Sequence, residues 1–176
     1  MAASDGRGTM SEIPGAADVV IIGGGIVGVS AAFFLAEAGG MRVVVLERGA
    51  IGSGATGRAA GVILLQVESE AEVRLQLDSL ALHRRLCDEL GTDLAAHGSL
   101  LLWTSEDEAA GARELAAGHR ACGIPLELLD AAEIRRRFPY LEAEDVVLAT
   151  FSADDPWATP LAVVRRLADA ARARGA

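Results

Sequence analysis

Six residues near the N-terminus have the types and spacing of a phosphate-binding turn. The motif GGGIVG, at positions 23–28, matches GxGxxG and follows the apolar run 18–22 directly. In such a turn the first glycine permits a tight bend, the second lets the backbone approach a pyrophosphate, and the third allows close helix–strand packing. The N–H groups at the start of the following helix then face the anion. Because the motif lies inside a βαβ pattern of about thirty residues, it predicts a dinucleotide site.

A carboxylate stands where such a site needs one. Glu47 ends the second apolar run, about twenty residues after the last glycine of the motif. Its oxygens could accept hydrogen bonds from both ribose hydroxyls of an adenosine, and its charge would repel a 2′-phosphate, which disfavours NADP. The alternative is a structural α/β turn followed by a surface glutamate, which explains the whole context less well.

The segment that follows favours FAD over NAD. Residues 48–61 read RGAIGSGATGRAAG, a long loop of small residues, whereas an NAD-binding unit usually moves quickly to its next element. Small residues allow close backbone contact with an extended cofactor, and the hydroxyls of Ser53 and Thr56 could bond phosphate oxygens. A plain mobile loop and an NAD-binding module are the alternatives.

Apolar periodicity and helix-capping signals predict the elements that position these residues. Ser69 with Glu72, and Ser105 with Glu108, have the spacing of capping boxes. The run 18–22 reads DVVII and is continuously apolar after its first residue, which is typical of a parallel strand covered on both faces. The expected elements are strands at 18–22, 41–46, 99–104 and 146–151, and helices at 26–38, from Ser69 to Gly91, from Ser105 to Gly123, from Asp130 to Pro139, and from Pro160 to near Gly175.

Composition narrows the function classes. The net charge of −9 argues against a nucleic-acid surface, and all sixteen basic residues are arginines, so no lysine nucleophile exists. The three histidines lack metal-ligand spacing, and Cys87 and Cys122 are expected to be reduced structural thiols, so no metal site is predicted. The apolar stretch 19–38 is interrupted by glycines, so we expect no membrane association and a cytoplasmic location.

Several segments together resemble a known family. DVVIIGGGIVGVSAAFFLAEAG, VVVLERG and GSGATGRAAG are similar to the start of the FAD-dependent D-amino-acid oxidase superfamily, and most of all to its sarcosine oxidase, glycine oxidase and dimethylglycine dehydrogenase branch. LDAAEIRRRFPYL and the segment 154–160 also fit, so the resemblance covers nearly all of residues 18–176. The glycine motif is specific for dinucleotides, GSGATGRAAG is fairly specific for this flavin group, and the remainder is suggestive.

The resemblance implies an FAD site at the matching positions. The pyrophosphate would lie on residues 23–28, the adenosine ribose on Glu47 and the adenine beside Arg48, while 53–56 would continue the phosphate contacts and 58–61 would run toward the isoalloxazine. Arg58 stands where some dehydrogenases of this branch carry a histidine bonded to the flavin, so FAD is expected to be non-covalent through this half. The implied contact residues are Gly23, Gly24, Gly25, Ile26, Val27, Gly28, Glu47, Arg48, Ser53, Ala55, Thr56, Arg58, Ala60 and Gly61.

Arg58 has two further interpretations. Its cation could stabilise negative charge on reduced flavin or bind a substrate carboxylate, or it could be a surface or phosphate-contacting arginine, which we favour. No residue of the chain is assigned a catalytic role, because the family's substrate residues lie mostly in its second half.

The resemblance also implies a fold and a reaction. The expected fold is α/β, with a Rossmann-like FAD-binding βαβ unit and the beginning of an α+β substrate domain, truncated in this chain. The expected activity is oxidation of a small amine or amino acid by hydride transfer to flavin. The alternative is a non-catalytic half that needs a complementary C-terminal half or a homo-oligomer. The expected division is a disordered leader at 1–17, an FAD-binding unit and loop at 18–67, a substrate-domain segment at 68–152, and a helix returning to the FAD domain at 153–176.

Overall fold

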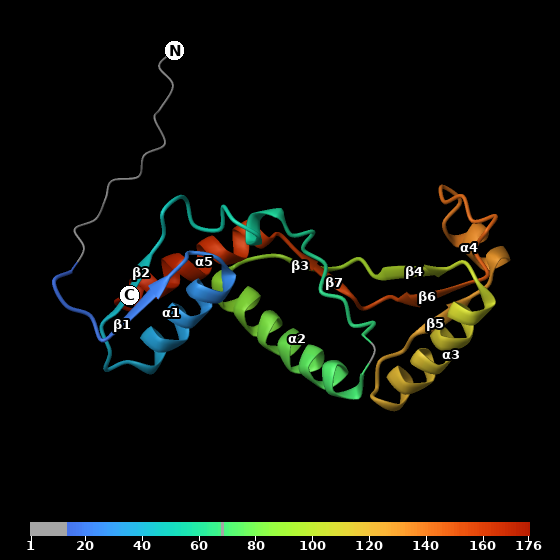
Figure 1. Ribbon diagram of the computed structural model, residues 1–176, viewed down its shortest axis with the longest axis horizontal. Coiled ribbons are helices and arrows are strands. Elements are labelled where there is room, and N and C mark those ends of the chain that lie inside the picture. Colours follow the sequence, from blue (N-terminus) through green and yellow to red (C-terminus); the bar gives the residue numbers. More distant parts are fainter. Residues whose placement is uncertain (1–13, 68) are drawn as a thin grey trace, which may run out of the picture. The chain divides into compact units, whose positions relative to one another are not determined.

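A computed structural model describes residues 14–67 and 69–176, which form two compact units (Figure 1). The first unit comprises the described residues up to Ala60 together with Thr159–Ala176, and the second is Gly61–Ala158. The sequence placed these boundaries after residues 67 and 152. The observed boundaries differ because residues 61–67 and 153–158 both belong to the second unit, where Val62 forms a β-bridge with Trp157. The part of the expected leader at 1–13 lies outside the described residues.

The first unit is built on a parallel strand pair. Strands β1 and β2 pair in register from Val19 with Val43, helix α1 connects them, and α5 packs against α1. Phe33 of α1 and Leu167 of α5 are among the fully buried side chains of this unit. The expected βαβ order is therefore confirmed, with the second strand two residues shorter than predicted. Its elements are β1 (Val19–Ile22), α1 (Ile26–Ala38), β2 (Val43–Leu46), the 3₁₀ helix η1 (Thr56–Arg58) and α5 (Pro160–Ala173).

One face of this two-stranded sheet is uncovered. Side chains of β1 alternate between half-buried and exposed, and the exposed fractions of Val20 and Ile22 are 53% and 88%. The expectation that this strand is covered on both faces is therefore wrong for this chain. The physical reason is that α1 packs on one face of the pair, while no described element of the unit buries the other.

The second unit combines an antiparallel sheet with helices. Strand β6 lies between β4 and β5 in a three-stranded sheet, and β3 pairs antiparallel with β7. The predicted helices are present, whereas β3, β5 and β7 were not predicted, because three residues are too few to show a period. The elements are α2 (Glu70–Leu90), β3 (Leu94–Ala96), β4 (Ser99–Trp103), α3 (Glu106–Ala121), β5 (Glu127–Leu129), α4 (Ala131–Arg137), β6 (Leu148–Ser152) and β7 (Pro156–Ala158).

Reciprocal capping boxes begin α2 and α3, as the spacing predicted. The N–H of Glu72 donates to Ser69 Oγ at 3.2 Å, and the N–H of Ser69 donates to Glu72 Oε2 at 3.0 Å. Ser105 and Glu108 repeat this arrangement at the start of α3. A cap of this kind stabilises a helix by about 1 kcal/mol.

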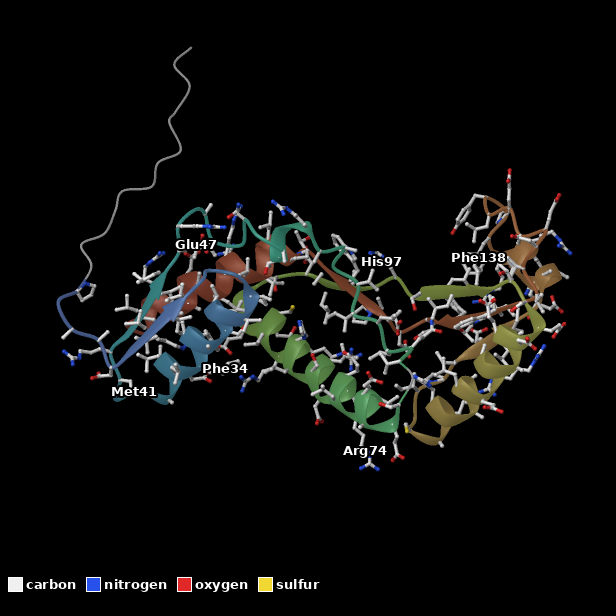
Figure 2. The ribbon with its side chains drawn as sticks, viewed as in Figure 1. Phe34, Met41, Glu47, Arg74, His97 and Phe138 are labelled. Atoms are coloured by element: carbon white, nitrogen blue, oxygen red, sulfur yellow. The ribbon has the colours of Figure 1, made fainter. Side chains whose placement is uncertain are left out.

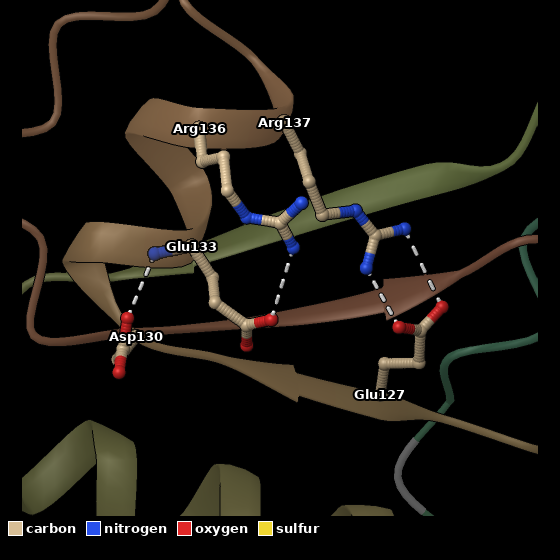
Figure 3. A network of polar contacts seen from close by, with 5 residues as sticks. All are labelled: Glu127, Asp130, Glu133, Arg136 and Arg137. Atoms are coloured by element: carbon tan, nitrogen blue, oxygen red, sulfur yellow. Dashed lines mark hydrogen bonds and ion pairs between the residues drawn. The ribbon is translucent and has the colours of Figure 1, made fainter.

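Helix α4 is fixed to its sheet by polar contacts (Figure 3). Asp130 caps it by accepting the Glu133 N–H at 2.8 Å. At its other end, Arg137 Nη1 donates to Glu127 Oε2 of β5 at 2.6 Å, and its guanidinium lies 4.6 Å from the centre of the Phe151 ring of β6. One arginine therefore ties α4 to two strands through an ion pair and a cation–π contact.

A buried polar network joins three chain segments of the second unit. Asp155, whose exposed fraction is 1%, accepts the Ser152 hydroxyl at 2.6 Å and the Ser99 hydroxyl at 2.5 Å. Its Oδ2 also accepts the N–H of Leu65 at 3.3 Å, and the Gln66 amide donates to Ser99 Oγ at 2.8 Å. Such a network holds its segments in register, because a buried donor that lost its acceptor would cost free energy.

Candidate cofactor-binding site

At position 28, the last position of the glycine motif, only a glycine fits. A Cβ added to Gly28 would lie 2.1 Å from the carbonyl oxygen of Gly23 and 3.2 Å from Ile21 Cγ2. Gly23 itself has φ +115°, a conformation that favours glycine. The two outer glycines are therefore required by backbone geometry, as the motif predicted.

Gly25, the second glycine of the GxGxxG pattern, faces open space. A Cβ on Gly25 would contact only Thr56 Oγ1, at 3.2 Å, and otherwise faces space in which a ligand could lie. Gly24, in contrast, is buried, and a Cβ there would lie 2.6 Å from Ile51 Cδ1. The turn is thus closed toward the loop at Gly24 and open at Gly25, which is the glycine that the motif assigns to close pyrophosphate approach.

The backbone amides of this turn divide into two groups. Three of them have protein acceptors: Gly23 donates to Leu46 O at 2.8 Å, Gly24 to Glu47 Oε2 at 2.7 Å, and Ile26 to Thr56 Oγ1 at 3.0 Å. The remaining three have no acceptor among the residues that the structure describes; they belong to Gly25, Val27 and Gly28. They lie at the positive end of the α1 dipole, so this turn fits an anion such as a pyrophosphate.

Glu47 directly follows β2 (Figure 2). Backbone amides hold its carboxylate. Its Oε2 accepts the Gly24 N–H and its Oε1 accepts the Gly49 N–H, both at 2.7 Å. These bonds, the one from Gly24 first, lower the pKa of Glu47 below its ordinary value. The sequence predicted a ribose acceptor here. In this structure the carboxylate joins the turn to the loop. Its oxygens keep further lone pairs that could accept hydrogen bonds from a ribose, and that role stays a prediction.

Replacing Glu47 with glutamine should change how stability depends on pH. Because the pKa of Glu47 is lowered in the folded state, its stabilising contribution is complete above the ordinary glutamate pKa of about 4.3. The contribution is lost as pH falls through the lowered pKa. Thermal melting of both proteins between about pH 7 and about pH 3 should show a constant Tm difference at neutral pH that shrinks on acidification. Parallel pH profiles would contradict this role.

The loop after β2 packs closely on its own unit. The N–H of Gly52 donates to Gly24 O at 2.8 Å, which joins the loop to the turn. A Cβ on the buried Gly52 would lie 2.7 Å from Val164 Cγ1 of α5, and one on Gly57 would lie 2.5 Å from Gly52 O. The small residues therefore allow the loop to approach α5 and itself, a use that the sequence reasoning did not foresee.

The other predicted contact residues are only partly brought together. The structure joins the motif at 23–28, Glu47 and Thr56 through the hydrogen bonds above. Gly61 begins the second unit, where its carbonyl accepts the Ala158 N–H at 3.0 Å. The contact roles of the loop's exposed residues stay predictions; these residues are Arg48, Ser53, Ala55, Arg58 and Ala60. Gly49, whose amide binds Glu47, was missed, although its place within RGAIGSG was a signal.

Metal-binding clusters and membrane-spanning helices are both absent from the described residues. Cys87 and Cys122 are free thiols, and residues 14–67 and 69–176 contain no group of three His, Cys, Asp or Glu side chains placed to hold a metal ion. Within the same residues, no helix has both the length and the apolar character needed to cross a bilayer. The cytoplasmic location stays a prediction.

Comparison with known proteins assigns the chain to a family. The DAO family model, described as FAD dependent oxidoreductase, matches residues 18–176. The chain belongs to this family. FAD is the cofactor of the family, and the acceptor-free amides at the start of α1 fit its pyrophosphate. The resemblance found in the sequence and the α/β fold expected from it are thereby confirmed.

Individual relatives agree with this assignment. Sarcosine dehydrogenase of Homo sapiens is 30% identical over 97% of this chain and 19% of its own length, and glycine oxidase of Geobacillus kaustophilus is 35% identical over 90% and 44%. The crystal structure of L-proline dehydrogenase from P. horikoshii superposes with a TM-score of 0.83 at 31% identity, covering 93% of this chain and 43% of that one. The chain thus spans less than half the length of these relatives.

Proposed function

We propose that this chain is the cofactor-binding N-terminal portion of an enzyme that oxidises a C–N bond in a small amine or amino acid. One observation carries the proposal: three amides at the start of α1 have no acceptor within residues 14–67 and 69–176, and they lie beside a carboxylate fixed by the same turn. When bound, FAD would supply the redox chemistry by accepting a hydride from the carbon next to the substrate nitrogen.

The residues of this chain would bind and select the cofactor. The amides of Gly25, Val27 and Gly28 would hold the pyrophosphate through hydrogen bonds that the α1 dipole strengthens. The negative charge of Glu47 would repel a 2′-phosphate near the adenosine, which disfavours NADP. Arg58, in place of a flavin-linked histidine, supports non-covalent attachment through this half.

The substrate class rests on the relatives. Their names specify sarcosine, glycine and L-proline, all small amino acids whose nitrogen adjoins a carbon that can lose a hydride. We extend that class, and not one of its members, to the enzyme to which this chain contributes. The residues that would choose between members are not assigned to this chain.

The visible spectrum of the purified chain tests the proposal. Titration with FAD should give flavin absorption bands that stay with the protein through gel filtration and are released on denaturation, because the attachment is non-covalent. NAD and NADP, titrated in parallel, should not compete with FAD. A well-folded, colourless chain that binds NAD would overturn the flavin assignment.

The uncovered sheet face favours a second candidate function. Val20, Ile22 and Leu46 lie on the same face and have exposed fractions of 53%, 88% and 37%. Contiguous apolar surface of this kind marks an interaction site. The chain would then be a cofactor-binding half whose sheet is covered by a complementary polypeptide. Ile22→Ser should reduce self-association of the isolated chain in sedimentation experiments, whereas a wild-type chain that stays monomeric at high concentration would contradict this candidate.

A further inference from the structure

Helix α1 lacks a side-chain cap from its own N-terminal residue. Its N-cap is Gly25, which has no side chain and makes no cap bond, although Ser, Thr, Asp or Asn usually fills this position. The hydroxyl of Thr56, thirty residues further along the chain, accepts the Ile26 N–H at 3.0 Å instead. A residue of the loop therefore satisfies an amide that the local sequence leaves without a partner.

The absence of a side chain at Gly25 makes this contact possible. A Cβ on Gly25 would lie 3.2 Å from Thr56 Oγ1, closer than most Cβ contacts, so the missing side chain is what lets the hydroxyl reach the helix. A second bond, from Gly52 N–H to Gly24 O at 2.8 Å, holds the loop on the other side of the same turn. The two bonds anchor the loop on both sides of Gly25.

From this geometry we propose that Thr56 is a positioning residue, whose hydroxyl closes the loop onto the start of α1 and forms the pyrophosphate-binding turn before any cofactor arrives. The inference rests on the proposed function, because it assigns Thr56 a role in preparing that site. The Ile26 amide already has a protein acceptor in the cofactor-free chain, and its predicted contact with the pyrophosphate stays a prediction.

Preorganisation gives this role a measurable consequence. A loop that is already ordered loses less conformational entropy when a ligand binds, and so supports higher affinity. While its oxygen accepts the Ile26 N–H, the hydroxyl of Thr56 also keeps its own proton to donate. Loss of the hydroxyl should therefore release the amide of Ile26 in the cofactor-free protein and weaken cofactor binding.

The test uses the full chain in four forms: wild type, Thr56→Val, Thr56→Ser and Thr159→Val. Thr159 is the matched control, because it is the N-cap of α5 and makes no side-chain cap bond. Amide hydrogen exchange at Ile26, measured without cofactor, should accelerate about tenfold in T56V and change little in T56S or T159V. The Kd for FAD, from the spectral titration, should rise about tenfold in T56V only.

The exchange rates test the role of Thr56, and FAD binding by the wild-type chain tests the proposed function. Ile26 exchange in T56V at the wild-type rate would overturn the proposal, as would a T56S variant as defective as T56V, because the hydroxyl would then not be the cause. If T56V does not fold, recovery of both exchange protection and FAD affinity in T56S carries the decision. A wild-type chain that binds no FAD contradicts the proposed function, while the exchange rates still decide whether Thr56 orders the turn.

Discussion

Gly28→Ala should abolish FAD binding and destabilise the first unit. The added Cβ would lie 2.1 Å from the carbonyl oxygen of Gly23, and a backbone atom cannot move aside as a flexible side chain can. Relieving this overlap requires β1 and α1 to separate, at a cost of about 3 kcal/mol or more. Urea denaturation and the FAD titration measure the two effects.

The control for this substitution is Gly54→Ala in the neighbouring loop. A Cβ at Gly54 meets nothing within 4 Å, so this variant should match the wild type in stability. A Gly28→Ala chain that retains wild-type FAD affinity would show that the turn can bind cofactor in another geometry.

Asp155→Ala should cause a comparable loss of stability in the second unit. Truncation leaves the buried hydroxyl of Ser152, the half-buried hydroxyl of Ser99 and the N–H of Leu65 without their acceptor. Unsatisfied buried donors cost about 1–3 kcal/mol each, so we expect a total loss of about 3 kcal/mol or more. Denaturation followed by circular dichroism measures it, and Asp155→Asn should lose less, because its amide oxygen can still accept.

The adjacent residue provides a matched comparison for this second effect. Asp154 is exposed and makes no hydrogen bond or ion pair with the described residues, so Asp154→Ala should be close to neutral. If the variants at 154 and 155 were equally stable, the buried network would not be what holds residues 65, 99 and 152 together.

The predictable part of the fold is the part specified by local patterns. Helix α1, the two capping boxes and the glycine turn follow from spacings within a few residues, and each is found where the sequence placed it. Strands β3, β5 and β7 escaped because three residues show no period, and because their place depends on partners far along the chain. The pairing of Val62 with Trp157, which sets the unit boundary, is likewise non-local.

The candidate site shows the same division. The glycines and Glu47 could be identified from spacing, because the motif constrains backbone conformation within one βαβ unit. The occupied state of the Ile26 amide could not, since it depends on where a loop residue thirty positions away comes to lie. Asp155 gave no signal, because aspartates before a proline are common in exposed turns.

The packing of α5 on α1 has a consequence for the order in which the chain can fold during synthesis. The second unit, Gly61–Ala158, is continuous in sequence and can form as soon as it leaves the ribosome. The first unit must wait for residues Thr159–Ala176, which follow the second unit in the sequence, although its glycine turn precedes that unit. Until α5 has been synthesised, no helix covers the apolar side of α1. During that time the nascent first unit is exposed to chaperones and to aggregation.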